Sequence, residues 1–242
     1  MVKMSFLEEW ILNKLKNFTL VMLIQGYMQM GKSTLAWYLM NNLSRLRGEG
    51  DWDYKKYCAR NLNEFIDMID RYENKLLVYE ECSKDISINK WYDDLNHFFN
   101  IIMQTQAYKH NLVCLVFPHV ASISNRQRYF IQLGLEIVER IDTPDCKATL
   151  FRPTLYKRNF WRLDDNDLIY KWWGSSFVKY SEKDLLLASD YTNWLIGTLK
   201  KDVMLDIKQK MHKHMEKLMP KIEKVEENTY KDNFFIERKP RW

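Results

Sequence analysis

Short apolar runs alternate with segments of helical periodicity over the first 142 residues of the chain. The longer runs are too short for buried helices and are typical of strands buried on both faces of a parallel sheet. The predicted strands are Phe18–Gln25, Lys75–Tyr79, Asn111–Phe117 and Glu136–Ile141, with a shorter one at Tyr54–Ala59. The predicted helices are Ser5–Lys16, Lys32–Leu46, a helix capped by Asn61, a helix from Ser87 or Asn89 to about Tyr108, and a short one around Asn125–Gln132. This alternation predicts an α/β fold with a mostly parallel, helix-flanked sheet.

The pattern changes near residue 143, where the regular alternation of strands and helices ends. We predict a β-hairpin around Pro153, with strands Ala148–Phe151 and Leu155–Arg162. From Leu199 onward, apolar residues recur every three or four positions, which predicts an amphipathic helix. The chain is therefore expected to divide into a core of residues 1–146 and a C-terminal extension of residues 147–242.

Composition excludes several classes of protein. The 242 residues are 46% hydrophobic and 29% charged, which is enough apolar material for a folded core and too much for a disordered chain. The longest apolar run, Phe18–Ile24, falls far short of the ~18 residues that span a bilayer. Glu8 and Glu9 lie where a secretory signal would need apolar residues, so we expect an intracellular protein without a membrane span. The widely separated cysteines favour reduced thiols over a zinc or redox motif.

The net charge of +5 is unevenly distributed, because the whole basic surplus lies in residues 147–242. A surplus of this size suits contact with a polyanion such as nucleic acid, and it serves solubility equally well. The charge distribution therefore leaves both interpretations open.

The most specific motif is a G-x-x-x-x-G-K-S loop that follows the first long predicted strand and opens a helix. Its residues are Gly26, Tyr27, Met28, Gln29, Met30, Gly31, Lys32 and Ser33, with Thr34 directly behind them. The two glycines let successive backbone N–H groups turn inward around a phosphate, and the helix points its positive end at the same place. Lys32 would neutralise the β- and γ-phosphates of ATP, and the Ser33 hydroxyl would bind Mg²⁺.

Two acids, Glu80 and Glu81, follow the predicted strand Lys75–Tyr79. We expect Glu80 at the end of a strand adjacent to the strand of the phosphate loop, where its carboxylate would hold Mg²⁺, usually through water. Glu81 would then face the attacking water and act as its general base. The reverse assignment of the two acids and a merely solvated strand end are the alternatives.

Arg126 and Arg128 lie just past the predicted strand Asn111–Phe117, at the edge where a catalytic cation would emerge. Phosphoryl transfer benefits from a cation that completes the charge clamp, often one from a neighbouring subunit. We hypothesise this catalytic role for the two arginines; a solvated position on a helix is the alternative.

Residues 18–142 resemble a P-loop ATPase of the additional-strand, RecA-like class, through the GYMQMGKS loop and the LLVYEE strand end. The resemblance implies an extra strand between the strands of these two motifs and the sheet order 5-1-4-3-2. Residues 111–141 also resemble the strand–proline–helix–strand section of the FtsK/HerA lineage, which includes packaging ATPases and zonular-occludens-toxin-like proteins. More particularly, the chain is similar to small ATPases of archaeal viruses and plasmids, which add a basic C-terminal part.

The chain departs from this lineage at one position that matters for function. Translocases of the lineage usually end the strand before the proline with a polar sensor residue, whereas Val116 and Phe117 occupy that place here. Sensing of the γ-phosphate would then fall to His119, Gln104 or Gln106. The first acid is also a glutamate instead of the usual aspartate, and these differences bear on translocation more than on hydrolysis.

The resemblance implies an ATP-hydrolysing, Mg²⁺-dependent motor that acts on DNA, in double-stranded form, during genome packaging, transfer or replication of a virus or plasmid. It also implies a homo-oligomer, with a hexameric ring as one form, and a cytoplasmic location, which for a viral protein is the host cytoplasm. One alternative is an ATP-gated DNA-binding or assembly switch, such as a replication initiator, that hydrolyses slowly. Another is a small-molecule kinase, although the chain has no evident arginine-bearing lid.

Overall fold

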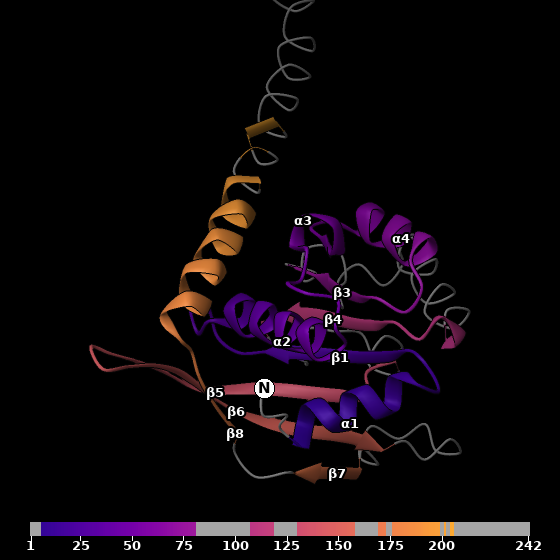
Figure 1. Cartoon of the computed structure of the whole chain (residues 1–242), viewed down its shortest axis with the longest axis horizontal. Coiled ribbons are helices and arrows are strands. Elements are labelled where there is room, and N and C mark those ends of the chain that lie inside the picture. The colour runs from indigo at the N-terminus through magenta and orange to yellow at the C-terminus, as the bar shows by residue number, and fades with distance from the viewer. Residues whose placement is uncertain are drawn as a thin grey trace, which may run out of the picture. The chain divides into compact units, whose positions relative to one another are not determined.

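The computed structural model describes residues 6–80, 107–118, 130–157, 169–172 and 176–198, together with residues 201, 204 and 205. The helices are α1 (Phe6–Leu15), α2 (Lys32–Leu46), α3 (Tyr54–Tyr57), α4 (Leu62–Arg71), the 3-10 helix η3 (Ala107–Lys109) and a helix over 182–198. The strands are β1 (Leu20–Gln25), β2 (Cys58–Ala59), β3 (Leu76–Tyr79), β4 (Leu112–Phe117), β5 (Leu133–Thr143), β6 (Cys146–Lys157), β7 (Ile169–Trp172) and β8 (Ser176–Lys179) (Figure 1). The predicted helix that starts at Ser87 or Asn89 and the one around Asn125–Gln132 lie largely outside the described residues.

One sheet organises the molecule, in the order β2-β3-β4-β1-β5-β6-β7, with β8 also paired to β6 (Figure 1). The first five strands in this order are parallel to one another, and β5 then pairs with β6 in antiparallel fashion. Their order, 5-1-4-3-2, confirms the fold of an additional-strand P-loop NTPase. The expectation that Glu80 would end a strand adjacent to β1 is wrong, because β4 lies between β1 and β3. Apolar runs reveal that strands exist, but they carry no information about which strands are neighbours.

One part of the core forms where helix α4 packs on the parallel strands. Alternate residues of a strand point to opposite faces of a sheet, and one set of them, including Val21, Leu77 and Val113, clusters with the apolar side of α4. Phe65 of α4 stacks on Tyr79 of β3 with ring centroids 4.7 Å apart. Strands β1, β3 and β4 are buried along all or almost all of their length, which agrees with their unbroken apolar sequences.

The segment before α4 differs from its prediction. A strand was expected over Tyr54–Ala59, but residues 54–57 form the single helical turn α3 and only Cys58 and Ala59 pair as β2. The turn closes because the Tyr57 N–H donates to the carbonyl of Asp53 at 3.0 Å. The predicted cap of α4 is confirmed, because the side chain of Asn61 accepts a hydrogen bond from the Glu64 N–H at 2.9 Å.

The hairpin also differs from its prediction. Pro153 lies inside the continuous strand β6, opposite Leu135 of β5, and the chain reverses between Thr143 and Cys146 instead. Proline lacks an N–H and is tolerated in a strand only where no ladder bond is needed. Among the described residues β8 pairs with residues 148–151 of β6 and β7 pairs with 154–157, so the outer edge at Pro153 falls in the gap between these two strands.

The helix over 182–198 was not predicted. Its start carries a reciprocal capping arrangement, in which the Asp184 N–H donates to Ser181 Oγ at 3.1 Å and the Ser181 hydroxyl donates to the Asp184 carboxylate at 2.6 Å. The first turn is held to α2 by an ion pair of 3.6 Å between Arg45 and Asp184. Just before the helix, Tyr180 donates its hydroxyl to Thr149 of β6 at 2.8 Å.

Two compact units make up the chain, Met1–Asn193 and Trp194–Trp242. The predicted division between residues 1–146 and 147–242 stays a prediction, but the sheet does not end there, because that boundary falls at the first residue of β6. In the second unit, residues 201, 204 and 205 are helical, within the span of the helix predicted from Leu199, and the rest of that helix lies outside the described residues.

Among the described helices, none combines the length and the apolar character that crossing a bilayer requires.

Candidate functional site

The backbone of the G-x-x-x-x-G-K-S loop has the conformation that its glycines were expected to permit. Gly31 adopts φ +82°, in the left-handed region that disfavours side chains, and α2 begins at the next residue, Lys32. Gly26 lies against β5, where a Cβ atom would come within 3.1 Å of the Ile137 Cβ. The loop therefore delivers the chain from the end of β1 into the first turn of α2, with the N-terminal N–H groups of that helix directed at the loop.

The ammonium group of Lys32 is held over the same loop. Its Nζ donates hydrogen bonds to the carbonyl oxygens of Gly26 at 2.9 Å and Tyr27 at 2.8 Å. A positive charge thus lies beside the amide cradle, where a phosphate with several negative charges would be attracted.

Ser33 and Glu80, which are far apart in the sequence, meet at the carboxyl edge of the sheet. Glu80 follows β3 directly and is only 1% exposed. The Ser33 hydroxyl donates to Glu80 Oε2 at 3.1 Å, and the Glu80 N–H donates to the Ala59 carbonyl at 2.9 Å. The contact joins the start of α2, which follows β1, to the residue after β3, since parallel strands bring their carboxyl ends to one edge of a sheet.

The second oxygen of Glu80 is bound by a residue that the sequence analysis missed. Tyr191, on the helix over 182–198, donates its hydroxyl to Glu80 Oε1 at 2.6 Å and lies 3.5 Å from Cys58 Sγ. Burial raises the pKa of Tyr191 well above its ordinary value, and the neighbouring Cys58 and Glu80 raise it further. Burial, followed by the charge of Glu80, likewise raises the pKa of the Cys58 thiol. Both groups therefore stay protonated and neutral beside the carboxylate.

A second residue that the sequence analysis missed is Arg140 of β5. Its Nη1 donates to the carbonyl oxygen of Gln29 in the phosphate loop at 3.4 Å, while its Nη2 pairs with Asp142 at 3.1 Å. The side chain is half exposed, so its cation lies on the solvent side of the loop. One signal in the sequence could have indicated it, because Arg140 is a basic residue near the carboxyl end of the predicted strand Glu136–Ile141.

Several predicted site residues lie outside the described residues: Glu81, Arg126 and Arg128, together with the sensor candidates His119, Gln104 and Gln106. Their roles stay predictions. Val116 and Phe117, which occupy the usual place of a polar sensor, are buried at the end of β4, with 4% and 1% of their surface exposed.

The residues present fit the two groups that the sequence predicts. A carboxylate oxygen 3.1 Å from a serine hydroxyl offers two hard oxygen ligands, which are the type that Mg²⁺ prefers. Backbone N–H groups at the start of α2, the positive φ of Gly31 and the Lys32 ammonium suit a chain of phosphates. The site is thus able to hold a nucleotide phosphate tail and a magnesium ion side by side.

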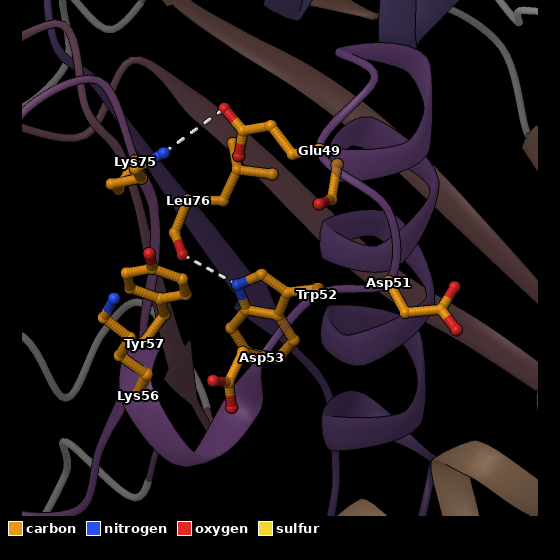
Figure 2. Close-up of a pocket in the computed structure, with 9 residues that line it drawn as sticks. Glu49, Asp51, Trp52, Asp53, Lys56, Tyr57, Lys75 and Leu76 are labelled. Carbon is orange, nitrogen blue, oxygen red and sulfur yellow. Dashed lines mark hydrogen bonds and ion pairs between the residues drawn. The ribbon is translucent and has the colours of Figure 1, made fainter.

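A separate cavity of about 220 Å³ opens elsewhere on the first unit (Figure 2). It is lined by Ser44, Glu49, Asp51, Trp52, Asp53, Lys56, Tyr57, Lys75 and Leu76. Lys75 pairs with Glu49 at 3.4 Å, and the Trp52 indole N–H donates to the Leu76 carbonyl at 2.9 Å. Because Leu76 begins β3 and Glu80 follows its end, this cavity lies at the opposite end of that strand from the phosphate loop.

No protein-family model matches the chain, and no curated protein matches it at a significant level. Among solved structures, the N-terminal domain of zonular occludens toxin from Neisseria meningitidis matches at 9% identity with a TM-score of 0.40, over 69% of this chain and 97% of that one. The DNA-packaging ATPase of Sulfolobus turreted icosahedral virus matches at 10% identity with a TM-score of 0.36, over 52% of this chain and 77% of that one.

A KaiC-like protein from Pyrococcus horikoshii matches at 14% identity with a TM-score of 0.38, over 67% of this chain and 90% of that one. The toxin domain and the viral ATPase are of the kinds that the sequence resemblance names. At these identities and scores, the matches carry no argument about what this chain binds or does, which has to come from its own site.

Proposed function

We propose that the chain is an ATPase that acts on double-stranded DNA as a motor. The observation that carries the proposal is the hydrogen bond of 3.1 Å between Ser33 of the phosphate loop and Glu80 after β3. In P-loop NTPases the magnesium ion is held by the loop's serine or threonine and by an acid at a strand end. A glycine turn without that acid would serve as a phosphate cradle only.

In this proposal the loop residues Gly26–Thr34 hold the triphosphate through their N–H groups, and Lys32 neutralises the β- and γ-phosphates. Ser33 and Glu80 would hold Mg²⁺, which when bound would neutralise the charge that develops on the phosphate oxygens. Arg140 adds a second cation from β5, on the solvent side of the loop. These residues bind and orient the nucleotide, and the proton transfer falls to another group.

Glu81 is proposed as the general base, because it follows Glu80 directly in the sequence. It takes a proton from a water molecule whose oxygen bonds to the γ-phosphorus, while the bond from that phosphorus to the β–γ bridging oxygen breaks. ADP and phosphate leave. Arg126 and Arg128 are proposed to complete the charge clamp from a neighbouring subunit, which makes the active form a homo-oligomer, with a hexameric ring as the proposed assembly.

DNA is proposed to bind the basic residues 147–242, where the whole surplus of positive charge lies. The biological step is proposed to be packaging or transfer of the genome of a virus or plasmid. A motor of this kind hydrolyses ATP faster when DNA is present.

The test measures ATP hydrolysis at low salt while double-stranded DNA is titrated into the full chain. We expect the rate to rise with DNA and to vanish in Lys32→Ala, because the ammonium that neutralises the β- and γ-phosphates is lost. Lys16→Ala is the matched control, since Lys16 is an exposed lysine that donates to the nearby Asn13. A rate that is flat across DNA concentrations would argue against a motor, and a fully active Lys32→Ala variant would contradict the ATP site itself.

A second function, an ATP-gated DNA-binding or assembly switch, is favoured by one observation. Val116 and Phe117 are apolar and buried at the end of β4, so neither side chain can contact the γ-phosphate as a polar sensor would. Turnover at saturating DNA separates the two functions. A motor should reach ~1–10² s⁻¹, whereas a switch should hydrolyse orders of magnitude more slowly.

A further inference from the structure

Glu80 is bound from two sides by hydroxyl groups that come from different parts of the chain. Ser33 on α2 donates to Oε2 at 3.1 Å, and Tyr191 on the helix over 182–198 donates to Oε1 at 2.6 Å. A carboxylate turns freely about its last bond unless a partner holds each oxygen. Ser33 is the partner that a metal would recruit, so Tyr191 is a partner that can hold the carboxylate both with and without the metal.

The hydroxyl of Tyr191 has a fixed position because its ring is enclosed. Tyr191 is 0% exposed, and its ring makes edge contacts with Trp52 and Tyr54, with centroids 6.0 Å and 5.4 Å away. A buried tyrosine ring has few rotamers, so the position of its oxygen follows the position of the helix backbone. The helix over 182–198 therefore decides where one oxygen of Glu80 is held.

We propose that Tyr191 is a positioning residue that aims the Glu80 carboxylate at the magnesium ion, so that the helix over 182–198 is part of the ATP site. The inference rests on the proposed function, because it takes Glu80 as a metal ligand. Groups that orient a metal ligand typically change metal affinity by about 10–100-fold when they are removed. A tyrosine that served only to fill the core would change stability and leave metal affinity unchanged.

The experiment compares Tyr191→Phe with Tyr180→Phe in the full chain. Both changes remove one buried hydroxyl and keep the ring, but the Tyr180 hydroxyl donates to Thr149 of β6 instead of to Glu80. Binding of Mn²⁺ to the ADP complex is measured by electron paramagnetic resonance, and binding of ADP without metal by calorimetry. In Tyr191→Phe we expect the Mn²⁺ dissociation constant to rise about tenfold, with metal-free ADP affinity unchanged. Tyr180→Phe should leave both affinities unchanged.

The outcomes distinguish a failure of the proposed function from a failure of the role given to Tyr191. If wild-type protein binds neither ADP nor Mn²⁺ with ADP, the proposed function fails whatever Tyr191 does. If wild-type protein binds both, and Tyr191→Phe binds Mn²⁺ as tightly as wild type, the role of Tyr191 is overturned and the ATP site stands.

A third variant covers the case in which Tyr191→Phe does not fold, as judged by circular dichroism. Placing 4-aminophenylalanine at position 191 keeps the ring and a hydrogen-bond donor, but its neutral N–H is a weaker donor than a phenol. We expect its Mn²⁺ affinity to be lower than that of wild type, with metal-free ADP affinity unchanged. An affinity equal to that of wild type at this position would contradict the inference.

Discussion

The phosphate loop and the helix over 182–198 both reach Glu80, and they do so by different physical routes. The loop is one continuous segment whose shape follows from Gly31 at positive φ and from the start of α2 at the next residue. Tyr191 lies 111 residues after Glu80 and arrives only because its helix packs on residues 52–58. The residues that bind phosphate follow from one local sequence motif, whereas the residue that orients Glu80 depends on tertiary packing.

The largest effect is expected from breaking the loop, with Gly31→Ala. A Cβ at Gly31 would meet its neighbours at ordinary distances, 3.9 Å from Arg140 and 4.0 Å from Thr34, so the strain comes from φ +82° alone. A loop that shifts to relieve it loses two or more hydrogen bonds to a charged phosphate, which should raise the ADP dissociation constant about a hundredfold. Isothermal titration calorimetry measures it.

Gly48→Ala is the control for that change. Gly48 has nearly the same strain, φ +76°, and a Cβ added there would meet no heavy atom within 4 Å, so the variant should lose similar stability and keep nucleotide affinity. Unaltered binding in Gly31→Ala would show that the loop's left-handed residue is not needed to hold phosphate.

A smaller effect is expected from Arg140→Ala, which tests whether a neighbouring strand contributes to the loop. The cation lies beside the Gln29 carbonyl and is half exposed, so its attraction to a phosphate is screened by salt. We expect ATP to bind about fivefold more weakly at low salt, with the difference shrinking as salt is added. Arg152→Ala on β6, also an exposed arginine in the sheet, removes the same charge and should leave ATP affinity unchanged. A loss independent of salt would point to a structural role for Arg140.

The sequence predicted best what is local. The bounds of α2 were predicted to the residue, because the motif sets its start and an apolar stripe sets its length. The meeting of Ser33 and Glu80 was also predictable, since both follow parallel strands at the same edge of the sheet. The order of those strands came from the family resemblance, and spacing alone gave the wrong neighbour for β3.

What the sequence did not reveal depended on distant partners. Pro153 looked like a turn, and only the gap between β7 and β8 explains why it sits inside a strand. The helix over 182–198 was recognisable in principle, because Ser181 and Asp184 have the spacing of a capping box. Even so, no local pattern indicates that Tyr191 on that helix would reach Glu80.

Two buried thiols make the docking of this helix measurable. Cys58 lies against the Tyr191 hydroxyl, while Cys114 is fully buried within β4. Burial raises the pKa of both thiols, and the charge of Glu80 raises it further. Thiol reagents attack the thiolate, so at pH 8 each cysteine should react only when its surroundings open.

The smallest effect is expected from Ser181→Ala, which removes the cap that starts the helix. Losing a capping serine costs about 1 kcal/mol, so local opening should become about fivefold more frequent. Cys58 labelling should accelerate by that factor and should be faster than Cys114 labelling in both proteins, because undocking of the helix is a smaller opening than that of the sheet; mass spectrometry of labelled peptides resolves the two. Ser181→Gly, which costs only a few tenths of a kcal/mol, should barely change either rate. If Cys58 and Cys114 were labelled at the same rate in both proteins, the helix would unfold with the sheet instead of separately, and the contrast between the phosphate loop and the docked helix would fail.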